Sequence, residues 1–185
     1  MIEVRWHGRG GQGVVTSSEI LAKSALLEGK YVQHFPEFGP ERRGAPVRAF
    51  TRISEEPIDL HYGIYNPDVV VVIDPTLLSD MEFITMGIKK NGYLIVNSQK
   101  VTDELAKFSK ETLVKLYYVD AYTIALDTFG RPFYNTPMLG AMVKATGIIS
   151  LDSVISIVKQ RFSGEIVDKN IQAIKRAYEE VVLYE

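Results

Sequence analysis

The sequence predicts an α/β fold with an open, mostly parallel sheet, helices on both faces of the sheet and a helical C-terminal part. The first observation is a glycine-rich turn that separates strand-like residues 2–6 from a helical pattern over residues 13–27. The second is a pair of apolar runs at residues 69–73 and 93–97, which are typical of strands buried on both faces of a parallel sheet. Strands and helices alternate along most of the chain, which favours a single domain over residues 1–185.

The first elements follow from local patterns. Apolar residues recur at helical spacing within residues 13–27, and Gly29 is placed to end that helix. Residues 31–35 and 47–53 alternate like strands, and the connection between them, residues 36–46, is long and rich in proline, glycine and charge. Loops of this length without obvious secondary structure are often functional.

The rest of the chain continues the alternation. Residues 120–126 are expected to pass from the end of a strand into a helix, residues 132–137 to be irregular, and Ser150 to cap the helix that follows it. The other elements expected are helices at 76–88, 103–110, 138–146, 151–162 and 166–184, and a strand at 114–119. Four apolar residues of the last helix share a face that we expect to pack on the sheet: Ile171, Ile174, Tyr178 and Val182.

The composition excludes several classes of partner. Of 185 residues, 46% are hydrophobic and 24% charged, and the net charge is −2, so there is no electrostatic case for binding nucleic acid or a membrane surface. The longest apolar run, residues 69–73, is too short to cross a bilayer, and the N-terminus has no signal-peptide pattern. We therefore expect a cytoplasmic protein that binds neither nucleic acid nor membrane.

Cysteine and histidine usage limits the chemistry. The chain contains no cysteine, which excludes disulfides, thiolate nucleophiles and cysteine-ligated iron–sulfur clusters within it. The three histidines, His7, His34 and His61, do not lie at a metal-site spacing and are expected at the surface or in the packing. We expect no metal site in this chain, and any redox cofactor must lie on another one.

The glycine-rich turn is the first candidate site. Gly8, Gly10 and Gly13 fit the G-x-G-x-x-G spacing, and glycines let a ligand approach the main chain closely. The helix that follows presents unpaired N–H groups and partial positive charge, which suit a phosphate, and Arg9 adds a fixed charge. The alternative, that Gly10 and Gly11 only close a tight turn, stays open.

The second candidate lies in the long connection. Glu41, Arg42 and Arg43 follow one another there, and two guanidinium groups on a loop could grip a phosphate or the carboxylate of a partner. An ordinary solvated loop is the alternative for these residues.

Other enzyme classes have a similar glycine spacing, but this sequence lacks the further residues that those classes require. A dinucleotide-binding dehydrogenase places an acidic residue at the end of its second strand, but the second strand expected here ends at Phe35 and the next carboxylate, Glu37, lies in the loop. A P-loop would need Gly-Lys-Ser/Thr after the glycines, and Ser17 and Ser18 do not lie in G-x-S-x-G. A stand-alone Rossmann-type dinucleotide-binding protein therefore remains an alternative only.

Several stretches in order along the chain resemble the gamma subunits of 2-oxoacid:ferredoxin oxidoreductases, most of all those of the pyruvate:ferredoxin enzymes. The one departure noticed is Tyr122, where a smaller polar residue is expected. The matching stretches are residues 7–13 (HGRGGQG), 38–46 (FGPERRGAP), 66–68 (NPD) running into Asp74, 96–98 (VNS), 120–125 (DAYTIA) and 135–141 (NTPMLGA).

The resemblance implies a Rossmann-like, non-catalytic subunit of a hetero-oligomer. Such enzymes oxidatively decarboxylate a 2-oxoacid on thiamine diphosphate with Mg²⁺, pass electrons through iron–sulfur clusters to ferredoxin, and transfer the acyl group to coenzyme A. The alpha, beta and delta subunits hold the thiamine site and the clusters. The gamma chain covers the active site and helps to bind coenzyme A, holds no cofactor alone and is expected to be inactive when isolated.

Coenzyme A carries a diphosphate and a 3′-phosphate, which suit the two candidate sites. We therefore expect the turn to cradle phosphate through its main chain while arginines of both loops neutralise the charge. Three alternatives remain: both loops dock on the alpha and beta chains, the chain is a structural assembly factor, or it serves or is shared with a 2-oxoisovalerate enzyme. The expected cofactor-binding residues are Arg9, Gly10, Gly11, Gln12, Gly13, Thr16, Glu41, Arg42 and Arg43.

Overall fold

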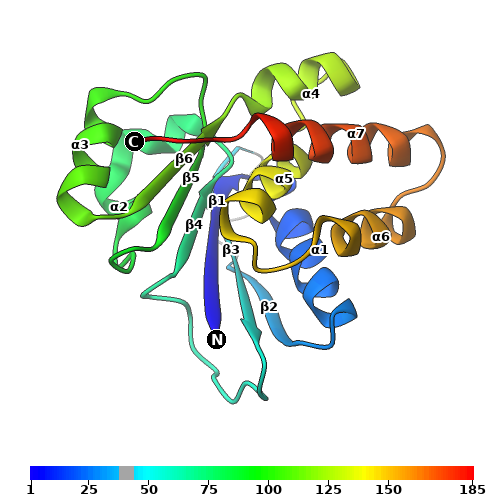
Figure 1. The fold of residues 1–185 in the computed structure, drawn as a ribbon, viewed down its shortest axis with the longest axis horizontal. Coiled ribbons are helices and arrows are strands. Elements are labelled where there is room, and N and C mark those ends of the chain that lie inside the picture. Colours follow the sequence, from blue (N-terminus) through cyan, green and yellow to red (C-terminus); the bar gives the residue numbers. More distant parts are fainter. Residues whose placement is uncertain (38–43) are drawn as a thin grey trace.

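The computed structural model describes residues 1–37 and 44–185, which form one seven-stranded sheet covered by helices (Figure 1). The strand order across the sheet is β2-β3-β1-β4-β5-β6-β7. The strands are β1 (Ile2–Arg9), β2 (Tyr31–Glu37), β3 (Pro46–Ser54), β4 (Val69–Val72), β5 (Tyr93–Asn97), β6 (Lys115–Val119) and β7 (Val182–Leu183). The helices are α1 (Val14–Leu27), η1 (Pro75–Asp80, a 3₁₀ helix), α2 (Met81–Thr85), α3 (Asp103–Thr112), α4 (Ala121–Phe129), α5 (Asn135–Thr146), α6 (Leu151–Arg161) and α7 (Glu165–Glu180).

The predicted α/β class with an open sheet is confirmed, and the sheet is mixed. Strands β1, β4, β5 and β6 pair in parallel at its centre. Strand β3 pairs antiparallel with both β1 and β2, and β7 pairs antiparallel with β6. Because these four strands are parallel, their carboxyl ends lie at the same edge of the sheet, next to the starts of the helices that follow them.

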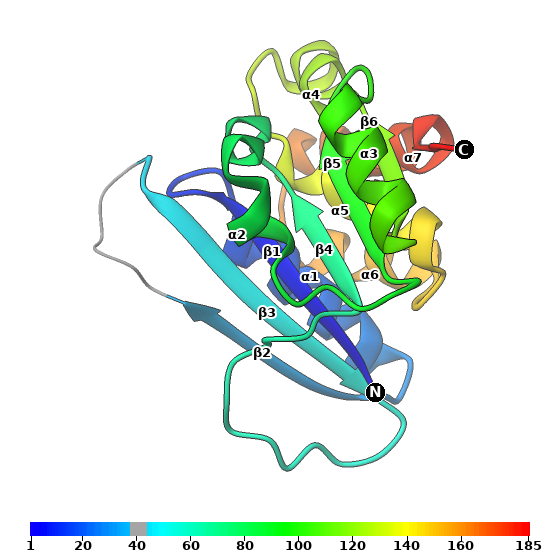
Figure 2. The same ribbon diagram turned by 90° about the vertical axis from the view of Figure 1, so that its left-hand side faces the viewer.

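The central strand β4 is buried on both faces, as its unbroken valine run predicts. Val71 packs in a core with Trp6, Ile95 and residues of α1, α5, α6 and α7. Val70 and Val72 pack in a second core with Leu94 and residues of η1, α2 and α3. Helices thus cover both faces, and Figure 2 shows α2 and α3 in front of the sheet with α1 behind it.

The last helix differs from the prediction in its end and in what it packs against. Helix α7 stops at Glu180, and Val182 and Leu183 pair with β6 as a short edge strand. Its buried face lies against α5 instead of the sheet, and a Cβ on Gly140 of α5 would come 2.2 Å from the carbonyl oxygen of Ile174. Glycine at that position lets the two helix backbones approach, so α5 takes the place next to the sheet and α7 forms an outer layer.

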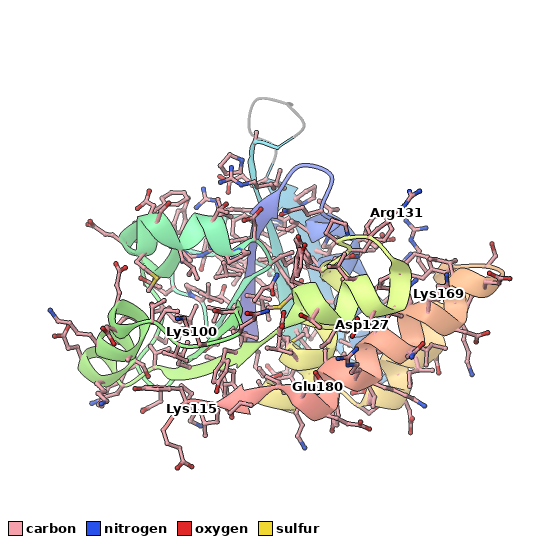
Figure 3. All side chains as sticks on the ribbon, turned by 90° about the horizontal axis from the view of Figure 1, so that it is seen from above. Lys100, Lys115, Asp127, Arg131, Lys169 and Glu180 are labelled. Atoms are coloured by element: carbon pink, nitrogen blue, oxygen red, sulfur yellow. The ribbon has the colours of Figure 1, made fainter. Side chains whose placement is uncertain are left out.

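A salt bridge ties α7 to α4 at the surface. Arg176 donates to Asp127 of α4 at 2.7 Å and to Glu180 of its own helix at 2.6 Å, and Figure 3 shows the two carboxylates where α4 and α7 run side by side. The pairs are exposed, so we assign them a role in orientation more than in stability.

Two local predictions are corrected by capping. The single helix expected at 76–88 is a 3₁₀ turn followed by the short α2, because the Asp80 side chain accepts from the Phe83 N–H and starts a new helix. Helix α5 begins at Asn135, earlier than expected, because Pro137 is tolerated in a first turn. The predicted cap on α6 is confirmed, since Ser150 Oγ accepts from the Ser153 N–H at 3.2 Å.

None of the helices in the described part of the chain is long and apolar enough to cross a membrane.

Candidate functional site

The glycine turn lies where the chain leaves neighbouring strands toward opposite faces of the sheet. After β1 the chain enters α1, which packs on the core around Trp6, and after β4 it enters η1, which packs on the core around Val70. In open α/β sheets the crevice at such a point, beyond the carboxyl ends of the strands, is where ligands bind. The topology therefore places the predicted turn at a binding position.

The first part of the turn continues the pairing of β1 with β3. Strand β1 extends to Arg9, beyond the predicted end, and the Gly10 N–H donates to the carbonyl of Ala45 at 2.8 Å. The Gly44 N–H in turn donates to the carbonyl of Gly10 at 3.2 Å. Gly10 thus extends the antiparallel pairing of β1 with β3, and its amide already has a partner.

The side chain of Gln12 connects the glycine turn to Asp74 through hydrogen bonds. Its Oε1 accepts from the Arg9 N–H at 2.7 Å, and its Nε2 donates to Asp74 Oδ2 at 2.5 Å. Asp74 is buried and also accepts from the Thr76 N–H at 2.9 Å and the Thr76 hydroxyl at 2.6 Å. Burial raises the pKa of Asp74, but the hydrogen bonds from Thr76 and Gln12 lower it more, so the carboxylate stays ionised and fixes the turn.

The second part of the turn opens α1. Gly13 is the N-cap of α1 with φ 76°, and no side chain caps the helix there. A Cβ on Gly13 would lie 2.7 Å from the side-chain amide of Asn135 at the start of α5, and the hydroxyl of Ser17 donates to the Asn135 carbonyl at 2.9 Å. Only glycine satisfies both the left-handed backbone and the close contact with α5.

A cavity of about 240 Å³ lies against this helix start, and we call it the glycine pocket. It brings together four of the predicted residues, Gly11, Gln12, Gly13 and Thr16. Its other lining residues are Phe129, Phe133, Asn135, Arg161, Phe162, Ile166 and Asn170.

Arg9 does not line the glycine pocket. Its guanidinium donates to the Thr76 hydroxyl at 2.8 and 3.1 Å and to the Gly44 carbonyl at 3.1 Å, and lies 3.4 Å from Asp74. It faces a second cavity, of about 500 Å³, between β3 and η1. The cation beside the glycine pocket is instead Arg161, at the end of α6, which the sequence reasoning missed.

The other expected binding residues, Glu41, Arg42 and Arg43, lie outside the described residues. Of the residues that the sequence reasoning missed, Asn135 belongs to one of the stretches that carry the family resemblance. Arg161 lies in none of these stretches. In the sequence it is a basic residue near the end of a helix, where basic residues are common, so nothing in the pattern distinguishes it.

The second cavity contains a buried histidine with a structural role. His7 is 1% exposed, and its Nε2 accepts from Arg5 Nε at 3.0 Å. Burial, with help from the nearby charges of Arg5 and Arg48, lowers the pKa of His7 to about 3, so the ring is neutral. Of the other histidines, His34 is half-buried and His61 exposed.

Comparison with known proteins gives a consistent set of relatives. The chain matches the family described as pyruvate ferredoxin/flavodoxin oxidoreductase over residues 3–180. It is 54% identical to the pyruvate/ketoisovalerate oxidoreductases common subunit gamma of Thermococcus litoralis, over 100% of both chains. It is also 51% identical to the pyruvate synthase subunit PorC of Methanothermobacter marburgensis, over 98% of each chain.

Solved structures show the same fold. The pyruvate oxidoreductase subunit PORC of Thermotoga maritima superposes with a TM-score of 0.86 at 45% identity, covering 100% of this chain and 98% of that one. The 2-oxoglutarate:ferredoxin oxidoreductase of Magnetococcus marinus gives a TM-score of 0.79 at 19% identity and covers 96% of this chain but 30% of that chain. The second likeness shows the fold alone, as one part of a longer polypeptide.

Proposed function

The chain belongs to the pyruvate ferredoxin/flavodoxin oxidoreductase family, and we propose that it is the gamma subunit of a multi-subunit pyruvate:ferredoxin oxidoreductase. Relatives that match it from end to end are named as gamma or PorC subunits of such enzymes, which supports this role. The complete enzyme would oxidatively decarboxylate pyruvate to acetyl-CoA and CO₂ and reduce ferredoxin.

In this proposal the redox chemistry takes place on the other chains. Thiamine diphosphate, Mg²⁺ and the iron–sulfur clusters would lie on the alpha, beta and delta subunits. This chain has no cysteine to bind a cluster, and its described residues contain no group of three or more His, Asp or Glu side chains that could hold a metal ion. The isolated chain, acting as one domain over residues 1–185, would then be inactive.

We further propose that this chain helps to bind coenzyme A in the glycine pocket. The observation that carries the proposal is the cavity itself, which brings an uncapped helix start and the cation of Arg161 to the carboxyl edge of the sheet. Main-chain N–H groups at the start of α1 suit a diphosphate, and Thr16 adds a hydroxyl. The Magnetococcus marinus enzyme, which contains this fold, was solved with coenzyme A and succinyl-CoA bound.

This assignment gives Arg9 a supporting role in place of a binding one. Arg9 contacts Thr76 and Asp74 and so connects the turn after β1 to the turn after β4. These contacts fix the positions of the two turns relative to each other. Arg161 takes over the expected charge neutralisation at the pocket.

The test is purification of the enzyme through a tag on this chain, followed by native mass spectrometry and a pyruvate- and coenzyme A-dependent assay of ferredoxin reduction. Co-purified subunits and activity support the gamma role, and an unaccompanied or separately active chain refutes it. Arg161→Ala should raise KM for coenzyme A about tenfold with kcat and assembly retained, because charge-assisted contacts are worth about that factor. Lys159→Ala, which removes a charge from the same helix outside the pocket, is the matched control.

One observation favours a second role beside the first. The Thermococcus litoralis relative is named as common to pyruvate and ketoisovalerate oxidoreductases. If this chain is shared in the same way, the tagged chain will recover two different sets of partner subunits, and the sample will oxidise both pyruvate and 2-oxoisovalerate. Recovery of one set only would exclude sharing.

A further inference from the structure

The cavity of about 500 Å³ between β3 and η1 plays no part in the proposed binding of coenzyme A. We call it the arginine pocket, because Arg9 and Arg48 line it. It lies where residues of η1 and α2 meet β3, on the face of the sheet that Figure 2 shows in front. No helix of the described chain lies in front of β2 and β3 on that face, so no described helix closes the pocket on that side.

Arg5 is a buried cation beside the arginine pocket. It is 1% exposed, and its guanidinium donates to the carbonyls of Ile84 at 2.9 Å and Met86 at 2.8 Å and to His7 Nε2 at 3.0 Å. Burial, together with the charge of Arg48, lowers the pKa of Arg5 to about 10, so the group stays charged at neutral pH. Its partners in the described part of the chain are all uncharged, and a buried charge without a counterion is costly. An anion in the adjoining pocket would offset that charge.

The hydrogen bond from Arg5 fixes the proton of His7 on one nitrogen. A guanidinium group only donates, so Nε2 of His7 is the unprotonated nitrogen. Because burial keeps the ring neutral, with a pKa of about 3, its single proton lies on Nδ1. His7 belongs to the lining of the pocket although it is 1% exposed, and its Nδ1 has no hydrogen-bond partner among residues 1–37 and 44–185. The pocket is therefore left with a buried N–H donor that a ligand can use.

The two arginines of the lining already have counterions. Arg48 pairs with Glu37, whose Oε1 accepts from Arg48 Nη2 at 2.7 Å, and Arg9 lies 3.4 Å from Asp74. These arginines add donors to the pocket without adding net charge. Of the cations around the pocket in the described chain, Arg5 alone is thus without a counterion. One negative charge balances it, which favours a carboxylate over a doubly charged phosphate.

Asp80 also lines the pocket and has no arginine partner in the described chain. It is exposed, and its Oδ1 accepts from the Phe83 N–H at 3.2 Å as the cap of α2. Water and salt screen an exposed charge far better than a buried one. Asp80 therefore opposes an anion in the pocket less than the buried Arg5 attracts it.

Apolar side chains form much of the wall. Val47 of β3, Leu77 of η1 and Ile84 of α2 line the pocket, and the last two are buried in the core around Val70. The ring of Phe83 is 41% exposed, and the Arg48 guanidinium lies over it, 5.0 Å from its centroid. Ligand pockets usually combine such apolar walls with a few polar groups that orient the ligand. The arginine pocket therefore suits a carboxylate that carries a short apolar chain.

We propose that the arginine pocket binds a carboxylate that carries a short apolar chain. The carboxylate accepts from the His7 Nδ1–H and from Arg48, and the chain packs against Phe83 and Leu77. It offsets the charge of Arg5 through the imidazole that lies between them. This inference uses a different cavity from the coenzyme A proposal and does not depend on it. Two sources share the chemistry, namely a free short-chain carboxylic acid and an aspartate or glutamate side chain of a neighbouring subunit.

Nuclear magnetic resonance of the full chain labelled with ¹⁵N-histidine tests the buried donor. His7→Gln identifies the His7 signals among those of the three histidines. At pH 7 His7 should be neutral with its proton on Nδ1, and isovalerate should shift that N–H signal saturably. His34 and His61, which do not line the pocket, should not shift, and sodium chloride at the same ionic strength should leave His7 unchanged. A proton on Nε2, or a His7 signal that does not respond to isovalerate, would overturn the proposal.

The same titration with other anions tests the class of ligand. Isovalerate should bind at least about tenfold more tightly than acetate, because the pocket buries its apolar chain. Inorganic phosphate should bind more weakly than isovalerate. Equal affinities for acetate and isovalerate would refute the apolar chain, and tighter binding of phosphate would refute the single carboxylate.

Substitution of Arg48 tests the second donor. Arg48→Met should weaken isovalerate binding about tenfold, the usual worth of a charge-assisted hydrogen bond. Arg131→Met, which removes an exposed arginine between α4 and α5, is the matched control and should leave the affinity unchanged. Unchanged affinity in the Arg48→Met chain would overturn the assignment of Arg48 to the site. The titrations of the unaltered chain decide the proposal even where a variant fails to fold.

Calorimetry on the assembled enzyme separates the two sources of the carboxylate. If it is a free acid, the purified complex should bind isovalerate as tightly as the full chain alone, and Arg48→Met should keep all partner subunits. If it belongs to a neighbouring subunit, the complex should not bind isovalerate, and Arg48→Met should lose that subunit during purification. None of these measurements involves coenzyme A, so their failure would leave the proposed function standing.

Discussion

Substitution of Gly13 by alanine tests the geometry of the glycine turn directly. Gly13 has φ 76°, and a Cβ there would meet the Asn135 side chain at 2.7 Å. Gly29 has nearly the same backbone, φ 81°, but a Cβ there would find nothing within 4 Å. The two substitutions therefore share the conformational cost and differ only in the contact with α5.

The magnitudes follow from these distances. An alanine in the left-handed region costs roughly 1 kcal/mol of unfolding free energy, so Gly29→Ala should lose about that much. Gly13→Ala should lose about 1 to 2 kcal/mol more, the usual cost of forcing an extra methyl group into a packed contact. Urea-induced unfolding of the full chain, with an unchanged m-value, measures both.

A double variant completes the design. Removing most of the Asn135 side chain with Asn135→Ala should return most of the extra loss of the Gly13→Ala chain, because the Asn135 amide is what the new methyl group meets. Equal losses for Gly13→Ala and Gly29→Ala, or no recovery in the double variant, would refute the proposed packing of the turn against α5. In the assembled enzyme the displaced Asn135 should also raise KM for coenzyme A.

Three further predictions concern the frame around the site. Gly140→Ala should destabilise the chain by about 3 kcal/mol in urea unfolding, because its Cβ would lie 2.2 Å from the backbone oxygen of Ile174 and must push α5 and α7 apart; a loss under about 1 kcal/mol would contradict that contact. Burial lowers the pKa of His7 from 6.5 to about 3, so between these pH values the unfolded chain binds a proton that the folded chain does not. The contribution of His7 to the free energy of unfolding should be complete above pH 6.5 and should fall by up to about 1.4 kcal/mol per pH unit toward pH 3. His7→Gln should remove this part of the pH dependence of stability. Asp74→Ala leaves Gln12 and Arg9 without their shared acceptor and should cost about 2 to 3 kcal/mol, with faster hydrogen exchange in the glycine turn; unchanged exchange there would show that Asp74 does not fix the turn.

The parts of the fold that the sequence could predict are those set by local patterns. The unbroken apolar run of β4, the cap at Ser150 and the change from strand to helix after Gly13 each depend on neighbouring residues. The packing of α7 could not be predicted in the same way. Its apolar face showed that the helix is buried on one side, but whether α5 or the sheet lies there depends on Gly140, far along the chain.

The candidate site shows the same division. The glycines predicted a turn at a helix start, and the structure places them there. The direction of Arg9 depends on Thr76 and Gly44, which reach it only in the folded sheet, and Arg161 arrives at the pocket through the path of α6. Such long-range neighbours leave no pattern in one sequence, so the turn was predictable and its charged partner was not.

Hydrogen exchange of the intact complex, measured with and without coenzyme A, shows whether this chain contacts the ligand. If this chain holds the diphosphate at the start of α1, coenzyme A should slow exchange of the amides in residues 11–17 of the assembled enzyme. Protection that is confined to the other subunits, with residues 11–17 unchanged at saturating coenzyme A, would contradict that placement of the diphosphate.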